Sequence, residues 1–204
     1  MGSHVELLVE EPSMEAFLRE LIPRVFPVER TFAVYPFQGK NDLLSKLPDR
    51  LRGYAHFLPD DWRIVVVVDR DDDDCLRLKR QMEDIAMQSG LRTRAQAGNA
   101  ACQVINRIAI EELEAWYFGD WQAVQAAYPR VSSTIRNQRP YRHADQVAGG
   151  TWEAFERVMQ AHGYFKGGLT KIDAARRIGA HVDPTRSSSH SFRVFGLAIE
   201  EALA

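Results

Sequence analysis

The sequence predicts an α/β fold, a largely parallel sheet flanked by helices, with a helical extension at the C-terminal end. One observation is the run from Ile64 to Val68, which is apolar and β-branched throughout and ends in the carboxylates of Asp69 and Asp71. Such a run is typical of a central strand that is buried on both faces. A second observation is that strand-like segments alternate with amphipathic helical ones up to about residue 120, as in βαβ units. Beyond residue 120 only helical patterns remain.

Five segments have the apolar or alternating pattern of strands: 5–9, 31–37, 64–68, 91–95 and 103–110. Four segments have apolar residues at helical spacing: 13–22, 41–56, 74–89 and 111–118. Ser13 is the expected N-cap of the first helix, which should end before Pro23. Pro48 is expected to kink or split the second helix, and Gly90 to cap the end of the third.

The part of the chain after residue 120 has a different character. Helical patterns cover 120–128, 152–161, 170–180 and 191–203, and a polar loop region covers 129–150. Ser189 or Ser191 is the expected cap of the last helix. We therefore expect an α/β domain over residues 1–120 and a helical region over residues 121–204 that packs on it.

The composition is that of an ordinary globular protein, with 45% hydrophobic and 26% charged residues. The formal net charge of −2 gives no bulk attraction to nucleic acid, and a local basic patch stays open. Cys75 and Cys102 lack metal-type spacing and are expected to be free thiols in a reducing compartment. No apolar run approaches the roughly 20 residues of a membrane helix, and the first four residues are no signal peptide. We expect a cytoplasmic protein without membrane contact.

Acidic residues follow three of the predicted strands at equivalent places. They are Glu10 and Glu11 after the first strand, Asp69 and Asp71 after the valine-rich one, and Glu111, Glu112 and Glu114 after the last. The carboxyl ends of parallel strands share one edge, and neighbouring strands lie ~4.8 Å apart, so these carboxylates would gather if their strands are neighbours. Gathered carboxylates need a cation, and Mg²⁺ or Mn²⁺ prefers carboxylate oxygen. The sequence therefore predicts a divalent-metal site at this edge.

A second interpretation applies to some of these acids, because carboxylates also stabilise helix N-termini through the helix dipole. We favour it for the three aspartates at 72–74, which are expected to be solvated capping residues. It also applies to Glu111 and Glu112, which are expected in the first turn of their helix. Glu111 and Glu114 are three residues apart and are expected to share a helix face better than Glu112 and Glu114 do.

Other residues also have two interpretations. The aromatic residues at 116–118 are expected in the core rather than as a platform that stacks on bases. Lys171 opens a predicted helix and is expected either to contact a phosphate or to be solvated. A phosphate-binding face for DNA or RNA would be formed by arginines in the second half of the chain: Arg136, Arg139, Arg142, Arg176, Arg177, Arg186 and Arg193.

Several of these residues match a known pattern. Segment 8–18 resembles the first TOPRIM motif, a strand that ends in Glu followed by Gly and a helix, and Asp69-Arg70-Asp71 resembles the TOPRIM DxD motif. Over nearly all of its length the chain resembles the bacterial TOPRIM-like family catalogued as domain of unknown function 4276. The residues that carry this resemblance are Gly39-Lys40, the strand 65–71, Cys75, segment 106–116, Lys171 and Ser191-Phe192. The resemblance implies a TOPRIM-like Rossmannoid fold.

The same resemblance implies a Mg²⁺-dependent nuclease. Glu10 would act as general acid or base. Asp69 and Asp71 would bind Mg²⁺ (or Mn²⁺) that stabilises charge on a phosphodiester during cleavage. Glu112 or Glu114 would complete a second metal position.

The resemblance further implies a phosphate contact for Lys171 and a role in phage defence beside an ATPase of the ABC/AAA kind. One departure is Glu11, which stands where the family pattern has Gly, and a charged side chain there would move Glu10 or crowd the site. This departure favours the alternative, a non-catalytic TOPRIM scaffold that serves as an interaction subunit of an ATPase complex. Phosphotransfer through an aspartyl nucleophile is disfavoured, because Asp73 stands where such enzymes have a hydroxyl residue or Val. The sequence leaves open whether the protein forms a homodimer.

Overall fold

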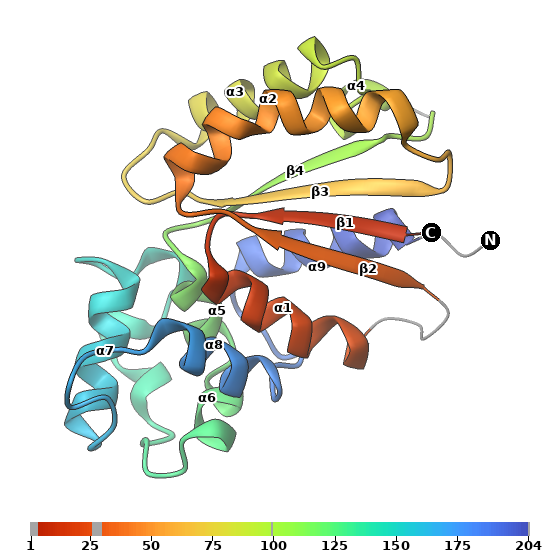
Figure 1. The fold of residues 1–204 in the computed structure, drawn as a ribbon. Coiled ribbons are helices and arrows are strands. Elements are labelled where there is room, and N and C mark those ends of the chain that lie inside the picture. The colour runs from red at the N-terminus through yellow and green to blue at the C-terminus, as the bar shows by residue number, and fades with distance from the viewer. Residues whose placement is uncertain (1–3, 26–29, 99, 204) are drawn as a thin grey trace.

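A four-stranded, all-parallel sheet forms the centre of the computed structural model, which describes residues 4–25, 30–98 and 100–203 (Figure 1). The strand order is β2-β1-β3-β4. The strands are β1 (His4–Val9), β2 (Thr31–Pro36), β3 (Trp62–Asp69) and β4 (Val104–Ala109). Residues 64 to 68 of β3 are at most 1% exposed, because helices cover both faces of the sheet. The predicted α/β fold is confirmed.

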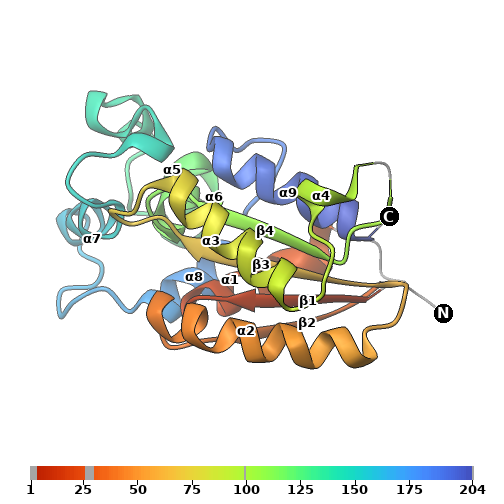
Figure 2. The same cartoon turned by 90° about the horizontal axis from the view of Figure 1, so that it is seen from above.

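One face of the sheet is covered by α2 (Lys40–Phe57) and α3 (Cys75–Gln88), as Figures 1 and 2 show. Leucines of α2 and apolar residues of α3 are fully buried against alternate residues of the strands. The α2 helix continues through Pro48, so this proline does not split it. Leu47 and Leu51, on either side of Pro48, both lie in the core, and their burial offsets the hydrogen bond that the proline removes.

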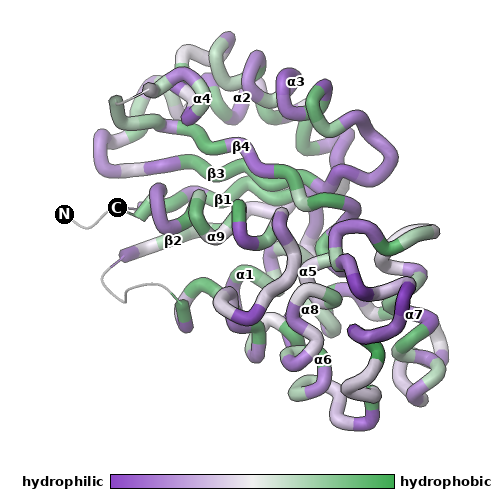
Figure 3. Tube along the Cα trace, turned by 180° about the vertical axis from the view of Figure 1, so that it is seen from behind, coloured by the Kyte–Doolittle hydropathy of each residue, from purple (hydrophilic) through white to green (hydrophobic). Residues whose placement is uncertain are grey.

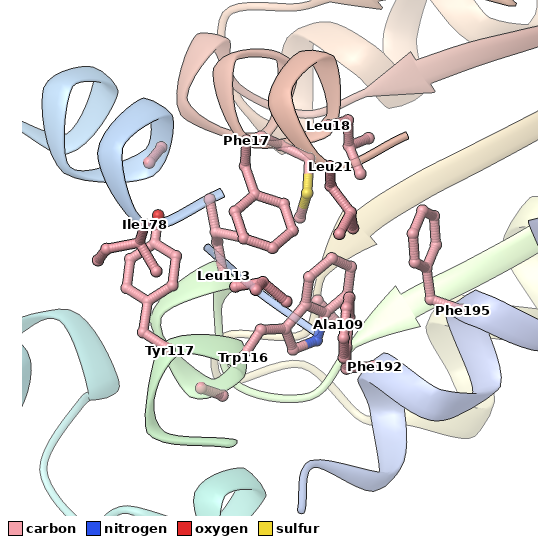
Figure 4. Packing of buried hydrophobic residues seen from close by; sticks show 14 of the residues in the cluster. Phe17, Leu18, Leu21, Ala109, Leu113, Trp116, Tyr117, Ile178, Phe192 and Phe195 are labelled. Carbon is pink, nitrogen blue, oxygen red and sulfur yellow. The ribbon is translucent and has the colours of Figure 1, made fainter. Parts of the chain in front are cut away.

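The other face is covered by α1 (Pro12–Val25) and α9 (His190–Leu203), while α8 (Lys171–Gly179) packs on α1 and α5 (Leu113–Gly119) packs on α9. Figure 4 shows that Phe17 of α1 meets Trp116 of α5 and Phe192 of α9. The Phe17 ring centre lies 5.8 Å from that of Trp116 and 6.2 Å from that of Phe192, distances at which aromatic rings attract one another. Tyr117 and Phe118 are equally buried. The prediction that residues 116–118 belong to the core is confirmed.

The remaining helices are α4 (Arg94–Ala97), α6 (Trp121–Ala127) and α7 (Thr151–Ala161). The expected polar loop contains three short 3₁₀ turns, η1 (Ile135–Asn137), η2 (Arg139–Tyr141) and η3 (Ala144–Gln146). Figure 3 shows the apolar strands enclosed by helices with polar outer sides. The α6 and α7 helices lie towards the end of the sheet where the strands finish, whereas α4 lies at the other end, beside the start of β4 (Figure 1).

The α9 helix begins with the predicted cap. The Ser189 hydroxyl oxygen accepts a hydrogen bond of 3.1 Å from the Phe192 N–H and donates one of 2.6 Å to Asp145. Asp145 also accepts from the Ser191 N–H at 3.0 Å. The Ser191 hydroxyl in turn accepts from the Trp116 indole N–H at 3.0 Å. The cap of α9 is therefore joined directly to the aromatic core.

Residues 91–95 are not a strand, contrary to the prediction. Thr93 makes an isolated parallel bridge to Val104, and the next residues form the short helix α4. A capping box between Thr93 and Gln96 explains this, because it satisfies backbone donors that a helix start leaves free.

The first helix also differs from its predicted bounds. It begins at Pro12, so Ser13 lies inside the helix and does not cap it, and it continues past Pro23 to Val25. Proline is well suited to the first helical position, where its missing N–H would be unpaired in any case. Gly90 is in the left-handed conformation after α3, as predicted for a C-terminal cap.

Both cysteines are free, as predicted. Within the described part of the chain, no helix is long and apolar enough to cross a membrane. The first three residues, to which the signal-peptide expectation also refers, lie outside the described residues. The division of the chain after residue 120 stays a prediction.

The contact between α1 and α8 depends on a glycine, and this generates a stability prediction. A Cβ atom on Gly179 would lie 2.8 Å from the Phe17 carbonyl oxygen, whereas one on Gly196 of α9 would have nothing within 4 Å. We expect Gly179→Ala to lower the free energy of unfolding by about 1–3 kcal/mol, because the helices must move apart. The matched control Gly196→Ala should raise it by up to about 1 kcal/mol. Urea midpoints at unchanged slope measure both, and equal midpoints would contradict the close approach.

Candidate functional site

The two central strands bring Glu10 and Asp69 together at the carboxyl edge of the sheet. Val9 of β1 is in register with Val67 of β3, so the residues that follow these strands lie next to each other. The Asp69 N–H donates a hydrogen bond of 2.9 Å to Glu10 Oε2. Glu10 is only 7% exposed. β4 lies on the other side of β3, so all three acid-bearing strands are neighbours.

Burial of Glu10 and Asp69 disfavours their ionised forms. It raises the pKa of Glu10 to about 7, although the hydrogen bond from the Asp69 N–H acts in the opposite direction. Burial, and after it the charges of Glu10 and Glu114, raises the pKa of Asp69 well above its ordinary value. Asp69 Oδ1 is buried and has no hydrogen-bond partner among the described residues. An unpaired buried acceptor of this kind costs about 1–3 kcal/mol, so a proton or a cation bound there would be strongly favoured.

Glu114 from α5 is a third buried carboxylate, 2% exposed. Burial raises its pKa to about 7, opposed by the charge of Lys171. Lys171 Nζ lies 3.8 Å from Glu11 Oε2 and 5.5 Å from the centre of the Trp152 ring. Burial alone would lower the pKa of Lys171, but the surrounding glutamates raise it overall, so the side chain stays an ammonium. The first residue of α8 thus places a positive charge beside the buried acids.

Lys40 is a residue of this region that the sequence analysis did not include among the site residues. Its Nζ lies 2.8 Å from Asp71 Oδ2 and 2.8 Å from Asp73 Oδ2, and it donates a hydrogen bond of 3.0 Å to the Arg70 carbonyl. Lys40 therefore neutralises the outer side of the acid cluster. Asp71, half exposed, is engaged by this lysine.

The signal that could have identified Lys40 is the glycine before it. Gly39 has φ +99°, a conformation that favours glycine, and its N–H donates a hydrogen bond of 3.0 Å to the Glu10 carbonyl. The turn after β2 is tied in this way to the turn after β1. The α2 helix therefore begins at the edge of the sheet where Glu10 lies.

Two of the acidic residues have left-handed backbone conformations, with φ +48° at Asp71 and +63° at Glu111. The Asp71 N–H donates a hydrogen bond of 3.0 Å to the Glu111 carbonyl, and the Glu111 carboxylate pairs with Arg70. The α5 helix begins only at Leu113, so the predictions that Glu111 and Glu112 lie in its first turn and that Glu111 shares a face with Glu114 are wrong. Strained residues of this kind are concentrated at functional sites.

Glu112 occupies the position just before α5 and faces α7. Its Oε2 accepts hydrogen bonds of 2.9 Å from the Thr151 hydroxyl and 3.0 Å from the Trp152 N–H. Burial raises the pKa of Glu112, although these two hydrogen bonds oppose the shift. Glu112 thus stabilises the N-terminus of α7 and connects it to the end of β4.

Glu11 stands where the resembling motif has Gly, yet its backbone is not in the left-handed region. A side chain is therefore tolerated there without strain. Its carboxylate accepts a hydrogen bond of 3.2 Å from the Ser13 hydroxyl and also lies near Lys171. Glu11 adds one more acid to the cluster rather than displacing Glu10, which remains bonded to Asp69.

The donor chemistry of this cluster fits a hard divalent cation. Glu10, Asp69 and Glu114 supply buried carboxylate oxygens, and one of these oxygens is unpaired. However, no three His, Cys, Asp or Glu side chains in the described ranges are arranged closely enough to hold a metal ion. Lys40 and Lys171 are the cations that compensate the acids in this arrangement. A metal would require the carboxylates to converge further.

The three aspartates at 72–74 behave largely as capping and surface residues. Asp74 caps α3, because its side chain accepts a hydrogen bond of 2.7 Å from the Arg77 N–H, and Asp72 is exposed. Asp73 differs in that it binds Lys40.

The arginines proposed as a phosphate-binding face lie on several elements. Arg186 pairs with the buried Asp120 at 2.8 Å, and Arg193 donates a hydrogen bond to the Ser187 carbonyl. These two therefore have local structural roles. A phosphate-binding face made by the rest stays a prediction.

The buried glutamates generate a prediction about pH. A glutamate of ordinary pKa 4.5 ionises in the unfolded chain well before Glu10 or Glu114 ionises in the folded one, near pH 7. Between these pH values the folded state holds more protons, so the free energy of unfolding falls as the pH rises. We expect a loss on the order of 2–3 kcal/mol for each group, complete above pH 7.

Urea unfolding at pH 5 and pH 7.5 in the absence of divalent ions measures this loss. In Glu114→Gln, the free energy of unfolding should fall less between these two pH values, because one of the two titrating glutamates has been removed. The matched control is Glu200→Gln, which removes a carboxylate from the exposed side of α9, outside the cluster. If the wild type and Glu114→Gln lose the same free energy, Glu114 does not titrate as its burial requires.

Comparison with protein families assigns most of the chain. The family described as a domain of unknown function (DUF4276) matches residues 9–200, a range that contains every acid and lysine of the cluster. No curated protein and no solved structure matches the chain. The chain therefore belongs to the family of domains of unknown function DUF4276.

Proposed function

We propose that the protein is a Mg²⁺-dependent nuclease that cleaves phosphodiester bonds of nucleic acid at the acid cluster, as its resemblance to TOPRIM domains implies. The observation that supports this most is the pair Glu10 and Asp69 at the carboxyl edge of the sheet: the buried Glu10 carboxylate accepts a hydrogen bond from the Asp69 N–H, and the buried Oδ1 of Asp69 is unpaired among the described residues. Such an arrangement destabilises the fold, and groups with strongly perturbed pKa values are concentrated at functional sites.

The roles follow from the position of each group. Glu10, Asp69 and Glu114 would hold the ion, and Asp71 would join them by exchanging Lys40 for it. The ion, when bound, supplies positive charge that stabilises the phosphodiester oxygens. Without the ion Glu10 has a pKa of about 7, and an ion beside it would lower this pKa, so Glu10 would serve as a base near neutral pH.

The two lysines are suited to contact phosphate. Lys171 lies among glutamates and stays charged, so its ammonium would bind a phosphate oxygen that approaches the cluster. Lys40, released from Asp71, would do the same from the side of α2.

Cleavage assays test the proposal directly. Plasmid DNA and RNA incubated with Mg²⁺ or Mn²⁺ should be cleaved by the wild type, and Asp69→Ala and Glu10→Gln should be slower by about 100-fold or more. The matched control is Asp72→Asn, which removes an exposed carboxylate three residues from Asp69 and should retain full activity. No cleavage by the wild type, or equal cleavage by Asp69→Ala, would contradict the proposal.

Metal binding gives a second prediction, independent of any substrate. Mn²⁺ requires ionised carboxylates, so its binding at pH 6.5 should release protons from groups such as Glu10 and Glu114, whose pKa lies near 7. Titration calorimetry in buffers of different ionisation enthalpy measures the number of protons released. Affinity should rise between pH 6 and pH 8, and Asp69→Asn should weaken it at least 10-fold. Affinity that is independent of pH would place the ion outside this cluster.

A second candidate function is a non-catalytic subunit of a complex with an ABC/AAA-type ATPase, in phage defence. The observation that favours it is that Lys40 and Lys171 already compensate the acids, while no metal-binding group is assembled among the described residues. This function would be favoured over the nuclease if the protein captures an ATPase encoded by a neighbouring gene and shows no affinity for Mn²⁺.

A further inference from the structure

A second candidate site is a cavity of about 480 Å³ between α2 and the side chains of β1, β2 and β3. Four aromatic side chains line it: Tyr35, Tyr54, Phe57 and Trp62. Its volume is in the range of pockets that hold small organic ligands. Phe57 is 63% exposed and Tyr35 38% exposed, so large apolar rings face water at the rim of the cavity.

The inner wall of the cavity is held in place by a buried carboxylate. Glu6 of β1 is 4% exposed, and its Oε2 accepts a hydrogen bond of 2.7 Å from the Tyr54 hydroxyl. Its Oε1 is 3.0 Å from His4 Nε2. These bonds hold the Tyr54 ring in one orientation, so the wall is formed before any ligand arrives.

Arg50 brings a positive charge into the cavity, whose lining also holds the carboxylates of Glu6 and Asp49. Its guanidinium carbon lies 4.6 Å from the centre of the Tyr35 ring and 5.3 Å from that of Tyr54, and it donates a hydrogen bond of 3.1 Å to the Tyr54 hydroxyl. An aromatic cage often binds a cation, but here the cation is already part of the protein. A flat ring with hydrogen-bond acceptors on its edge suits a guanidinium and aromatic rings together.

Gly53 provides the space. It lies inside α2, where glycine is a poor helix former, and a Cβ atom added there would meet nothing within 4 Å. A larger side chain at this position would extend into the cavity without clashing with the backbone. The absence of a side chain at Gly53 therefore leaves free space on the surface of α2 where a ligand would lie.

We propose that this pocket binds a nucleobase, stacked on the aromatic rings and hydrogen-bonded by Arg50. The base could belong to a free nucleotide or to a single strand of DNA or RNA, which share this chemistry. Gly53 lies thirteen residues along α2 from Lys40, about 20 Å at the rise of a helix, so a bound single strand of a few nucleotides reaches the acid cluster. Only this last step rests on the proposed nuclease; the pocket itself does not.

The test is a binding measurement in EDTA, where no cleavage takes place. Fluorescence anisotropy of a labelled single-stranded decamer, with the duplex of the same sequence and free AMP as competitors, gives the affinity and its source. We expect the single strand to bind and Phe57→Ala or Tyr35→Ala to weaken it about 5-fold to 100-fold, the loss typical of one base-stacking ring. Gly53→Leu should abolish binding, whereas Gly53→Ala, which adds only a methyl group, should retain most of it.

The competition experiments show whether the bound base belongs to a free nucleotide or to a nucleic-acid strand. Displacement by micromolar AMP would assign the pocket to free nucleotides, and displacement by the single strand alone would assign it to nucleic acid; either supports the proposal. Wild-type affinity in Gly53→Leu, with unchanged helical circular dichroism, would overturn it. Binding of N-acetyltryptophanamide with no response to AMP or the decamer would also overturn it and assign the pocket to a protein partner. Loss of nuclease activity with intact binding would affect only the proposed function.

Discussion

The hydrogen bond from the Asp69 N–H to the Glu10 carboxylate joins the two central strands at the point where both end. Its position follows from the register of β1 and β3, in which Val9 is paired with Val67. A slip of one residue would turn Asp69 and its neighbours to the wrong faces of the sheet. The chemistry at the edge therefore depends on the pairing of these two strands, which places the Asp69 N–H at the Glu10 carboxylate.

The helices that lie over this edge determine how far the pKa values of the acids are raised. The α5 helix brings Glu114, and α8 brings Lys171 from more than fifty residues further along the chain. Both helices are held by aromatic packing around Phe17 and Trp116, well inside the protein. Burial of three carboxylates disfavours folding, and this apolar core offsets the loss. The two lysines reduce the repulsion but leave Asp69 Oδ1 unpaired.

The sheet and the convergence of acids on one edge could be predicted from the sequence, because both depend on strand periodicity and on the geometry of parallel strands. The directions in which individual side chains point could not be predicted from the sequence. Whether Glu111 belongs to α5 depended on a left-handed turn that the residue type does not favour, and the partner of Glu112 is the start of α7, forty residues away. Lys40 was missed for the same reason, since its partners Asp71 and Asp73 become neighbours only after folding.

The α2 helix relates the acid cluster to the aromatic pocket. Its leucines are buried in the core along most of its length, so the helix is a rigid spacer between Lys40 at its N-terminus and Gly53 near its other end. The positive end of the helix dipole lies at the acid cluster, where it favours an approaching phosphate. The aromatic pocket lies towards the other end of α2, where the Arg50 guanidinium packs on the Tyr35 and Tyr54 rings. Under both proposals, a nucleic-acid strand lying along α2 would meet the aromatic pocket and, about 20 Å further on, the acid cluster, an arrangement that would suit cleavage at a set distance from the bound base.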